Sequence, residues 1–167
     1  MVERMSNPRT MLTALAVTLA LAVAAAPAAD AQFADRKALT LDGAKRIMAA
    51  AEAEAAKNKW TVAIAIVDEA GELVAFHKID ETQAGSIDIA IGKARTAARM
   101  KRPTKALEDA VAGGRTVFLA VDGLVPLEGG VPITVEGRVV GAVGVSGVTS
   151  QQDAQVAQAG LAALGVK

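Results

Sequence analysis

The spacing of apolar residues along the chain predicts four helices. Apolar residues recur every three or four positions over 41–58, which is the period of an amphipathic helix. Two more helices are expected over 87–100 and 103–111, the second beginning with proline, a residue well tolerated at the first helical position. A last helix follows Thr149 and Gln152, because a threonine three residues before a glutamine is the pattern of a capping box.

Five other segments have the composition or the alternation of β-strands. They span residues 61–67, 72–78, 116–121, 131–135 and 138–145. Short turns join the first two strands and the last two, so we expect hairpins and an antiparallel sheet. The predicted order is α-β-β-α-α-β-β-β-α, an α+β fold.

The first 31 residues have the pattern of a secretory signal peptide. Two arginines precede an uncharged run over 11–26, and the small-residue motif Ala29-Asp30-Ala31 follows. We therefore expect cleavage near residue 31, a single domain over 32–167, and a periplasmic or secreted location. The alternative is a retained anchor that tethers the same domain, although 16 apolar residues fall short of the roughly 20 that span a bilayer.

Composition excludes several classes of function. The chain carries 18 basic and 18 acidic residues and few aromatic residues, so nothing indicates nucleic-acid binding. It holds no cysteine, which excludes disulfides, zinc–thiolate sites, iron–sulfur clusters and cysteine nucleophiles. Without a recognisable set of catalytic residues, an enzyme is the less favoured interpretation.

The chain has a single histidine, His77, near the end of the second predicted strand. One histidine cannot build a site of several histidines, but it can be an axial ligand of haem iron or a general base. The alternative is an unengaged surface residue. Asp80 and Glu81 follow closely, and the three side chains form either a candidate site for a divalent metal or part of a solvated acidic loop.

Positive side chains on the second predicted helix are candidates for binding carboxylates. Arg95 and Arg99 are four residues apart, hence on one face of the helix, and Lys93 precedes them. Such a group can bind carboxylates, for example the propionates of haem. The alternative is that all three face solvent.

Two glycine-rich stretches lie in the C-terminal half. Gly129 and Gly130 precede Val131 and Pro132, and they either let a ligand approach the backbone closely or form a tight turn. The stretch 144–148, with Ser146 at its centre, partly matches the nucleophile elbow G-x-S-x-G. It departs from that motif because valine stands at its last position. We therefore interpret that serine as a small residue at a strand end.

Three sequence blocks together resemble the GlcG/HbpS family, which also forms the C-terminal domain of PduO-type proteins. The resemblance covers about residues 37–165. It rests on SIDIA (86–90) running into KARTAA (93–98) and RPT (102–104), on GGVPI (129–133), and on GRVVGAVGVSG (137–147) with QD (152–153) and AQAG (157–160).

The resemblance implies a profilin-like α/β/α sandwich with a central antiparallel five-stranded sheet, assembling into homo-oligomers. It also implies binding of haem or another tetrapyrrole, with corrinoid or iron in some members. One departure matters, because the family usually has Arg-Met-Asp-Gly-Ala where this chain has Lys78-Ile79-Asp80-Glu81-Thr82. If that loop shapes the ligand pocket, the ligand differs.

From these observations we expect an exported, oligomeric haem-binding protein with no membrane span after cleavage. His77 is the expected axial ligand, and the other expected haem contacts are Lys78, Lys93, Arg95, Arg99, Gly129, Gly130 and Pro132. Two alternatives stay open. One is an accessory module that binds a periplasmic protein partner, and the other is an enzyme that acts on haem or on a small oxidised carbon compound.

Overall fold

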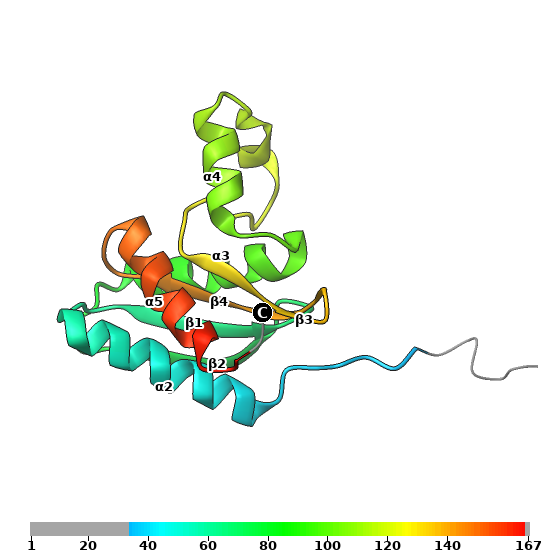
Figure 1. The fold of residues 1–167 in the computed structure, drawn as a ribbon. Helices are drawn as coiled ribbons and strands as arrows, with labels where there is room; N and C mark the ends of the chain where they lie inside the picture. The colour runs from blue at the N-terminus through cyan, green and yellow to red at the C-terminus, as the bar shows by residue number, and fades with distance from the viewer. Residues whose placement is uncertain (1–33, 166–167) are drawn as a thin grey trace, which may run out of the picture. The chain divides into compact units, whose positions relative to one another are not determined.

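The computed structural model describes residues 34–165, and its helices and strands lie in the unit that begins at Lys37 (Figure 1). The expected signal peptide, residues 1–31, lies outside the described residues. In chain order the elements are α2 (Leu41–Asn58), β1 (Ala63–Asp68), β2 (Leu73–Lys78), α3 (Gly85–Met100), α4 (Thr104–Ala112), the 3-10 helix η2 (Thr116–Ala120), β3 (Gly130–Val135), β4 (Arg138–Ser146) and α5 (Ser150–Ala162).

The helix ends follow local sequence signals. The Thr40 hydroxyl accepts a hydrogen bond from the Gly43 amide at 3.1 Å and caps α2. The capping box of α5 is confirmed, because Thr149 and Gln152 each bond to the other's backbone amide. No helix within residues 34–165 has both the length and the apolar character needed to cross a membrane.

The sheet has four antiparallel strands in the order β2-β1-β4-β3. Strands β1 and β4 are central, whereas β2 and β3 form the edges. Pro132 lies on β3 opposite Ala142 of β4, a position that suits proline because an edge strand does not need every amide for pairing.

The predicted fifth strand is wrong. Residues 116–121 are rich in β-branched and aromatic side chains, but Thr116–Ala120 form the 3-10 helix η2. This segment lies with α4 in a projection away from the sheet (Figure 1), so no strand is beside it to pair with. Strand propensity reflects packing on a pleated, half-buried surface, and here Val117 and Leu119 are each 62% exposed.

Helices cover both faces of the sheet, which confirms the α/β/α sandwich (Figure 1). Helices α2 and α5 cover the face that carries Ile64 and Ile66 of β1 together with Val143 and Val145 of β4. Helix α3 covers the other face, where most of the buried sheet residues are alanine or glycine, together with Val67 and Phe76. These small side chains let the backbone of α3 come close to β4, so the core on this side is thin.

Candidate functional site

The residues expected to bind haem lie in three separate places. His77 and Lys78 end β2, and Asp80 and Glu81 follow them in the next turn. Lys93 is buried beside Gly129 and Gly130. Arg95 and Arg99 contact the turn between β1 and β2. The structure therefore does not gather the whole expected set around one ligand.

His77 lies on the edge strand β2, opposite Ile64 of β1. Residues directly opposite each other in an antiparallel pair share a face, so His77 projects toward the α2 side of the sheet. Its side chain is 55% exposed, and its Nδ1 lies 2.6 Å from Oε1 of Glu52 on α2. Buried Met48, four residues before Glu52, packs in the core and fixes that face of α2 toward the sheet.

The second ring nitrogen of His77, Nε2, has no hydrogen-bond partner among residues 34–165. An ionised carboxylate only accepts hydrogen bonds, so the neutral imidazole carries its proton on Nδ1 and leaves the lone pair on Nε2. An exposed imidazole with one bonded nitrogen and one available nitrogen is the arrangement of a single axial metal ligand. The donor chemistry at His77 thus fits haem iron.

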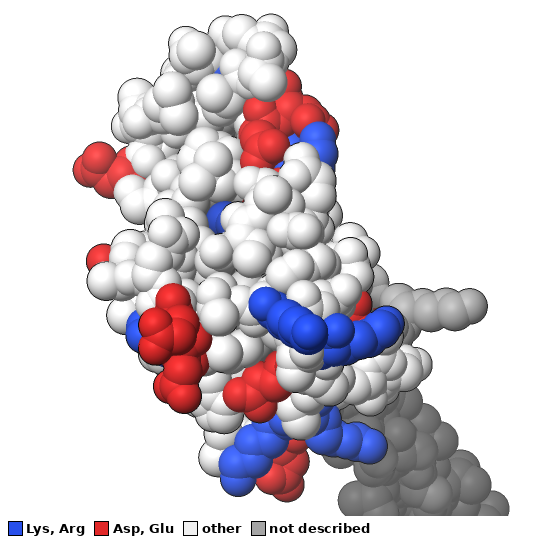
Figure 2. Space-filling model, turned by 90° about the vertical axis from the view of Figure 1, so that its left-hand side faces the viewer, with Lys and Arg blue, Asp and Glu red and all other residues white. Residues whose placement is uncertain are grey.

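The acidic residues after His77 do not complete a metal site. Asp80 and Glu81 are exposed in the turn that follows β2, and Glu81 has a left-handed backbone with φ of 65°. Within residues 34–165 no three histidine or carboxylate side chains come together as metal ligands. The end of the molecule where α2 ends carries acidic and basic side chains side by side (Figure 2).

Lys93 forms a buried ion pair that joins three elements. Its ammonium, from α3, lies 2.8 Å from Oδ2 of Asp153 on α5 and donates to the Val145 carbonyl of β4 at 3.0 Å. Both side chains are almost fully buried, at 3% and 2% exposure. Burial raises the pKa of Asp153, and Lys93 and the backbone amides of Val148 and Gly147 partly oppose this effect. The charge of Lys93 is therefore matched inside the protein.

Gly129 and Gly130 lie close to other atoms of the protein itself. A Cβ on Gly129 would lie 2.8 Å from the ammonium of Lys93, and the φ of this residue is 124°. A Cβ on Gly130 would lie 2.4 Å from the Lys93 carbonyl oxygen and 2.6 Å from Cγ2 of Thr104. Thr104 also accepts a hydrogen bond from the Gly130 amide at 2.9 Å. The glycines let the chain pass α3 and the ion pair closely.

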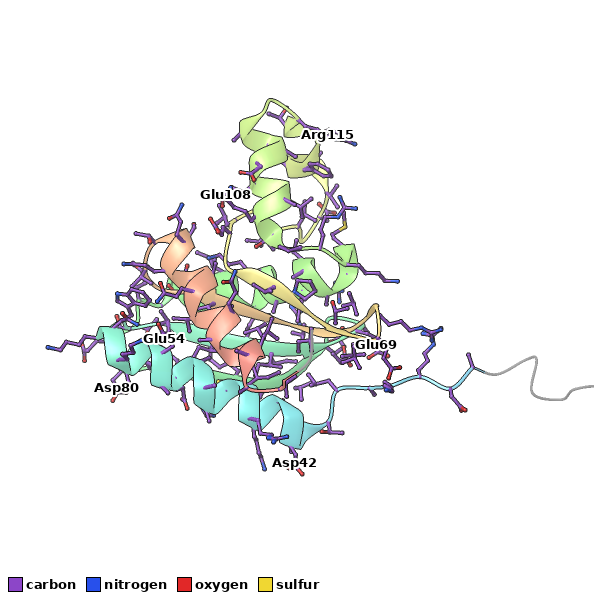
Figure 3. The ribbon with its side chains drawn as sticks, in the orientation of Figure 1. Asp42, Glu54, Glu69, Asp80, Glu108 and Arg115 are labelled. Atoms are coloured by element: carbon purple, nitrogen blue, oxygen red, sulfur yellow. The ribbon has the colours of Figure 1, made fainter. Side chains whose placement is uncertain are left out.

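The two arginines hold the β1–β2 turn. Nε of Arg95 donates to the Gly71 carbonyl at 3.2 Å, and Nε of Arg99 donates to the Ala70 carbonyl at 2.8 Å. Figure 3 places Glu69 of this turn at the opposite end of the molecule from Asp80, which follows β2. The arginines also come from α3, on the other face of the sheet from His77. A single haem bound to His77 therefore does not also reach Arg95 and Arg99.

Two residues of these sites carry no signal in the sequence pattern. Glu52 belongs to a helix rich in charged side chains, and its spacing from Glu54 indicates no paired site. Asp153 lies in the first turn of α5, where the helix dipole by itself favours an acidic residue. Their partners are 25 and 60 residues away in the chain, so only the fold brings them into contact.

Residues 39–162 match the model of the family described as haem degrading protein HbpS-like. Protein GlcG of Escherichia coli (strain K12) is 49% identical over 103 residues, which cover 62% of this chain and 77% of GlcG. The chain spans most of the length of that relative.

Solved structures share this fold. A double mutant of HbpS from Streptomyces reticuli superposes with a TM-score of 0.76 at 34% identity, covering 85% of this chain and 99% of that chain. A complex described as PduOC:Heme superposes with a TM-score of 0.74 at 29% identity, covering 78% of this chain and 98% of that chain.

Proposed function

The chain belongs to the HbpS-like family, and we propose that it is an exported protein that binds haem through His77. Relatives support the class of ligand, since the family is described as haem degrading and the PduOC structure is a haem complex. Export rests on the signal-like sequence of residues 1–31 and corresponds to a periplasmic or secreted protein.

The observation that carries the proposal is the available Nε2 of His77. Haem iron in proteins is held mainly by histidine, cysteine, tyrosine or methionine. This chain has one histidine, no cysteine and no tyrosine. Of the methionines within residues 34–165, Met48 is 3% exposed in the core and Met100, at the end of α3, is only partly exposed. His77 is therefore the strongest axial donor that the described domain offers. The neighbouring Lys78 is exposed but lies opposite Ala63, on the α3 side of the sheet, so it does not share the face of His77.

Replacing His77 by alanine is expected to weaken haemin binding by more than about tenfold, a free-energy change of about 1.4 kcal/mol or more. The wild-type apoprotein should give a saturable Soret band in a haemin titration, and the band of H77A should be shifted and should saturate at higher haemin concentration. Lys105→Ala, far along the chain on α4, is the matched surface control. An unchanged Soret band and affinity in H77A would contradict the assignment of the ligand.

Self-association is a second part of the proposal, and the exposed apolar side chains of the α4–η2 projection support it. The large apolar side chains exposed here are Val117, Leu119, Val121 and Leu127, between 42% and 62% exposed. Several such side chains close together in the chain are typical of a surface that binds protein. The occupant that we propose is a second copy of the chain, and a periplasmic partner protein is the alternative.

Charging this surface is expected to separate the copies. The double substitution Val117→Asp and Leu119→Asp should lower the sedimentation coefficient of the purified protein to that of a monomer, because carboxylates cannot be buried there unpaired. The fold should persist, since both positions are exposed. A wild-type protein that sediments as a monomer at all concentrations, or an oligomer that survives both substitutions, would contradict self-association through this surface.

A further inference from the structure

We infer that Glu52 is a positioning residue that fixes His77 in the tautomer with a free Nε2. The inference rests on the proposed function, because it takes Nε2 of His77 as the donor to haem iron. It adds a residue on a different element, α2, whose carboxylate lies 2.6 Å from Nδ1 of His77.

The geometry gives Glu52 control over a side chain that is otherwise loosely held. His77 is 55% exposed on an edge strand, so packing alone leaves the ring free to rotate. The helix that carries Glu52 is anchored by the core residues Met48, Ala51 and Ala55. A hydrogen bond from the strand to this anchored helix therefore fixes the direction of the imidazole ring.

The chemistry of the pair determines which nitrogen binds the metal. An imidazole without a partner favours the tautomer with its proton on Nε2, which blocks that nitrogen. The Glu52 carboxylate accepts a hydrogen bond from Nδ1–H and so stabilises the other tautomer. An outer carboxylate of this kind also orients a metal-binding imidazole and supports its bond to the metal.

Glu54 provides a matched control on the same helix. It lies two residues beyond Glu52 and accepts hydrogen bonds from Gln155 at 2.6 Å and from Asn58 at 3.0 Å, away from His77. These hydrogen bonds lower the pKa of Glu54, Gln155 contributing most. Glu54→Gln therefore removes a neighbouring negative charge without removing the partner of His77.

The first test needs no haem. Because the chain has one histidine, a nitrogen-15 NMR spectrum of the haem-free protein at alkaline pH, where an imidazole is neutral, contains one pair of ring signals. We expect Nδ1–H in the wild type and in Glu54→Gln, and a shift toward Nε2–H in Glu52→Ala. A wild-type ring protonated on Nε2, or no change in Glu52→Ala, would overturn the inference whatever haem does.

The second test uses haemin. Glu52→Ala should weaken haemin affinity by about 10- to 100-fold, the usual effect of losing such a hydrogen bond, and should raise the reduction potential of the bound iron. Glu54→Gln should change neither quantity. If the wild type binds haemin through His77 but Glu52→Ala leaves affinity and potential unchanged, the inference fails and the proposed function stands. If the wild type gives no saturable Soret band, the proposed function fails.

Discussion

Replacing Gly144 by alanine is expected to destabilise the fold by about 3 kcal/mol or more, at the upper end of what overpacking a core costs. Gly144 lies on central strand β4, opposite Ala65 and beneath α3. A Cβ at this position would lie 2.1 Å from the Ala90 carbonyl oxygen and 2.4 Å from the Ala94 amide nitrogen. Both are backbone atoms of one helix, so no side-chain rotation can relieve the overlap, and α3 must move as a whole.

Urea denaturation of the purified variant measures this loss. Gly85→Ala is the matched control, because Gly85 begins the same helix and a Cβ there meets nothing within 4 Å. We expect that control to be neutral or slightly stabilising, since alanine restricts the unfolded chain. If Gly144→Ala is as stable as Gly85→Ala, the backbone of α3 does not pack against Gly144 as closely as the structure shows.

Replacing Lys93 by methionine is expected to lower the free energy of unfolding by about 3–5 kcal/mol, because it leaves the buried carboxylate of Asp153 without its cation. Both partners are almost fully buried, and the Val148 amide remains as a donor to Asp153 at 3.2 Å. Lys105→Met provides the comparison. Its ion pair with Asp109 is exposed on α4 and screened by solvent, so we expect little or no loss of stability.

The loss in Lys93→Met should depend on pH in a defined direction. Burial already raises the pKa of Asp153, and removing the neighbouring cation raises it further. A native state with a raised carboxyl pKa binds a proton that the unfolded chain has released, so stability falls as pH rises through that interval. The penalty should therefore be smallest in acid and should grow toward neutral pH.

The double variant Lys93→Met with Asp153→Asn isolates the carboxylate. It lacks both charges, so its stability relative to Lys93→Met should increase as pH rises from acid to neutral. Equal stability of the two variants at every pH would mean that Asp153 is not a buried charge in the folded protein. If Lys93→Met lowers the free energy of unfolding by less than about 1 kcal/mol, the buried pair contributes no more to stability than a typical exposed ion pair.

The sequence predicted most of the elements because their signals are local. The 3.6-residue period of α2, the proline before α4 and the capping box of α5 act within a few residues of each other. The same local rule failed at 116–121, where β-branched residues indicated a strand. A strand needs a neighbour to pair with, and that condition depends on where the segment lies relative to the sheet.

The expected site residues could not be grouped in space from the sequence. Lys93, Arg95 and Arg99 all lie on one helix, yet Lys93 points into the core toward Asp153 while the arginines bond to the β1–β2 turn. Helical spacing gives the relative direction of side chains, but not what lies opposite each of them. Only the positions of β4 and α5 decide that Lys93 is neutralised inside the protein.

The sequence by itself determined the helices, the two hairpins, the family and the single histidine. The tertiary structure decided which side chains meet, because the strand order β2-β1-β4-β3 joins segments far apart in the chain. It placed Glu52 against His77 and Asp153 against Lys93. The physical reason is that local periodicity acts over a few residues, whereas these contacts depend on burying both faces of one sheet.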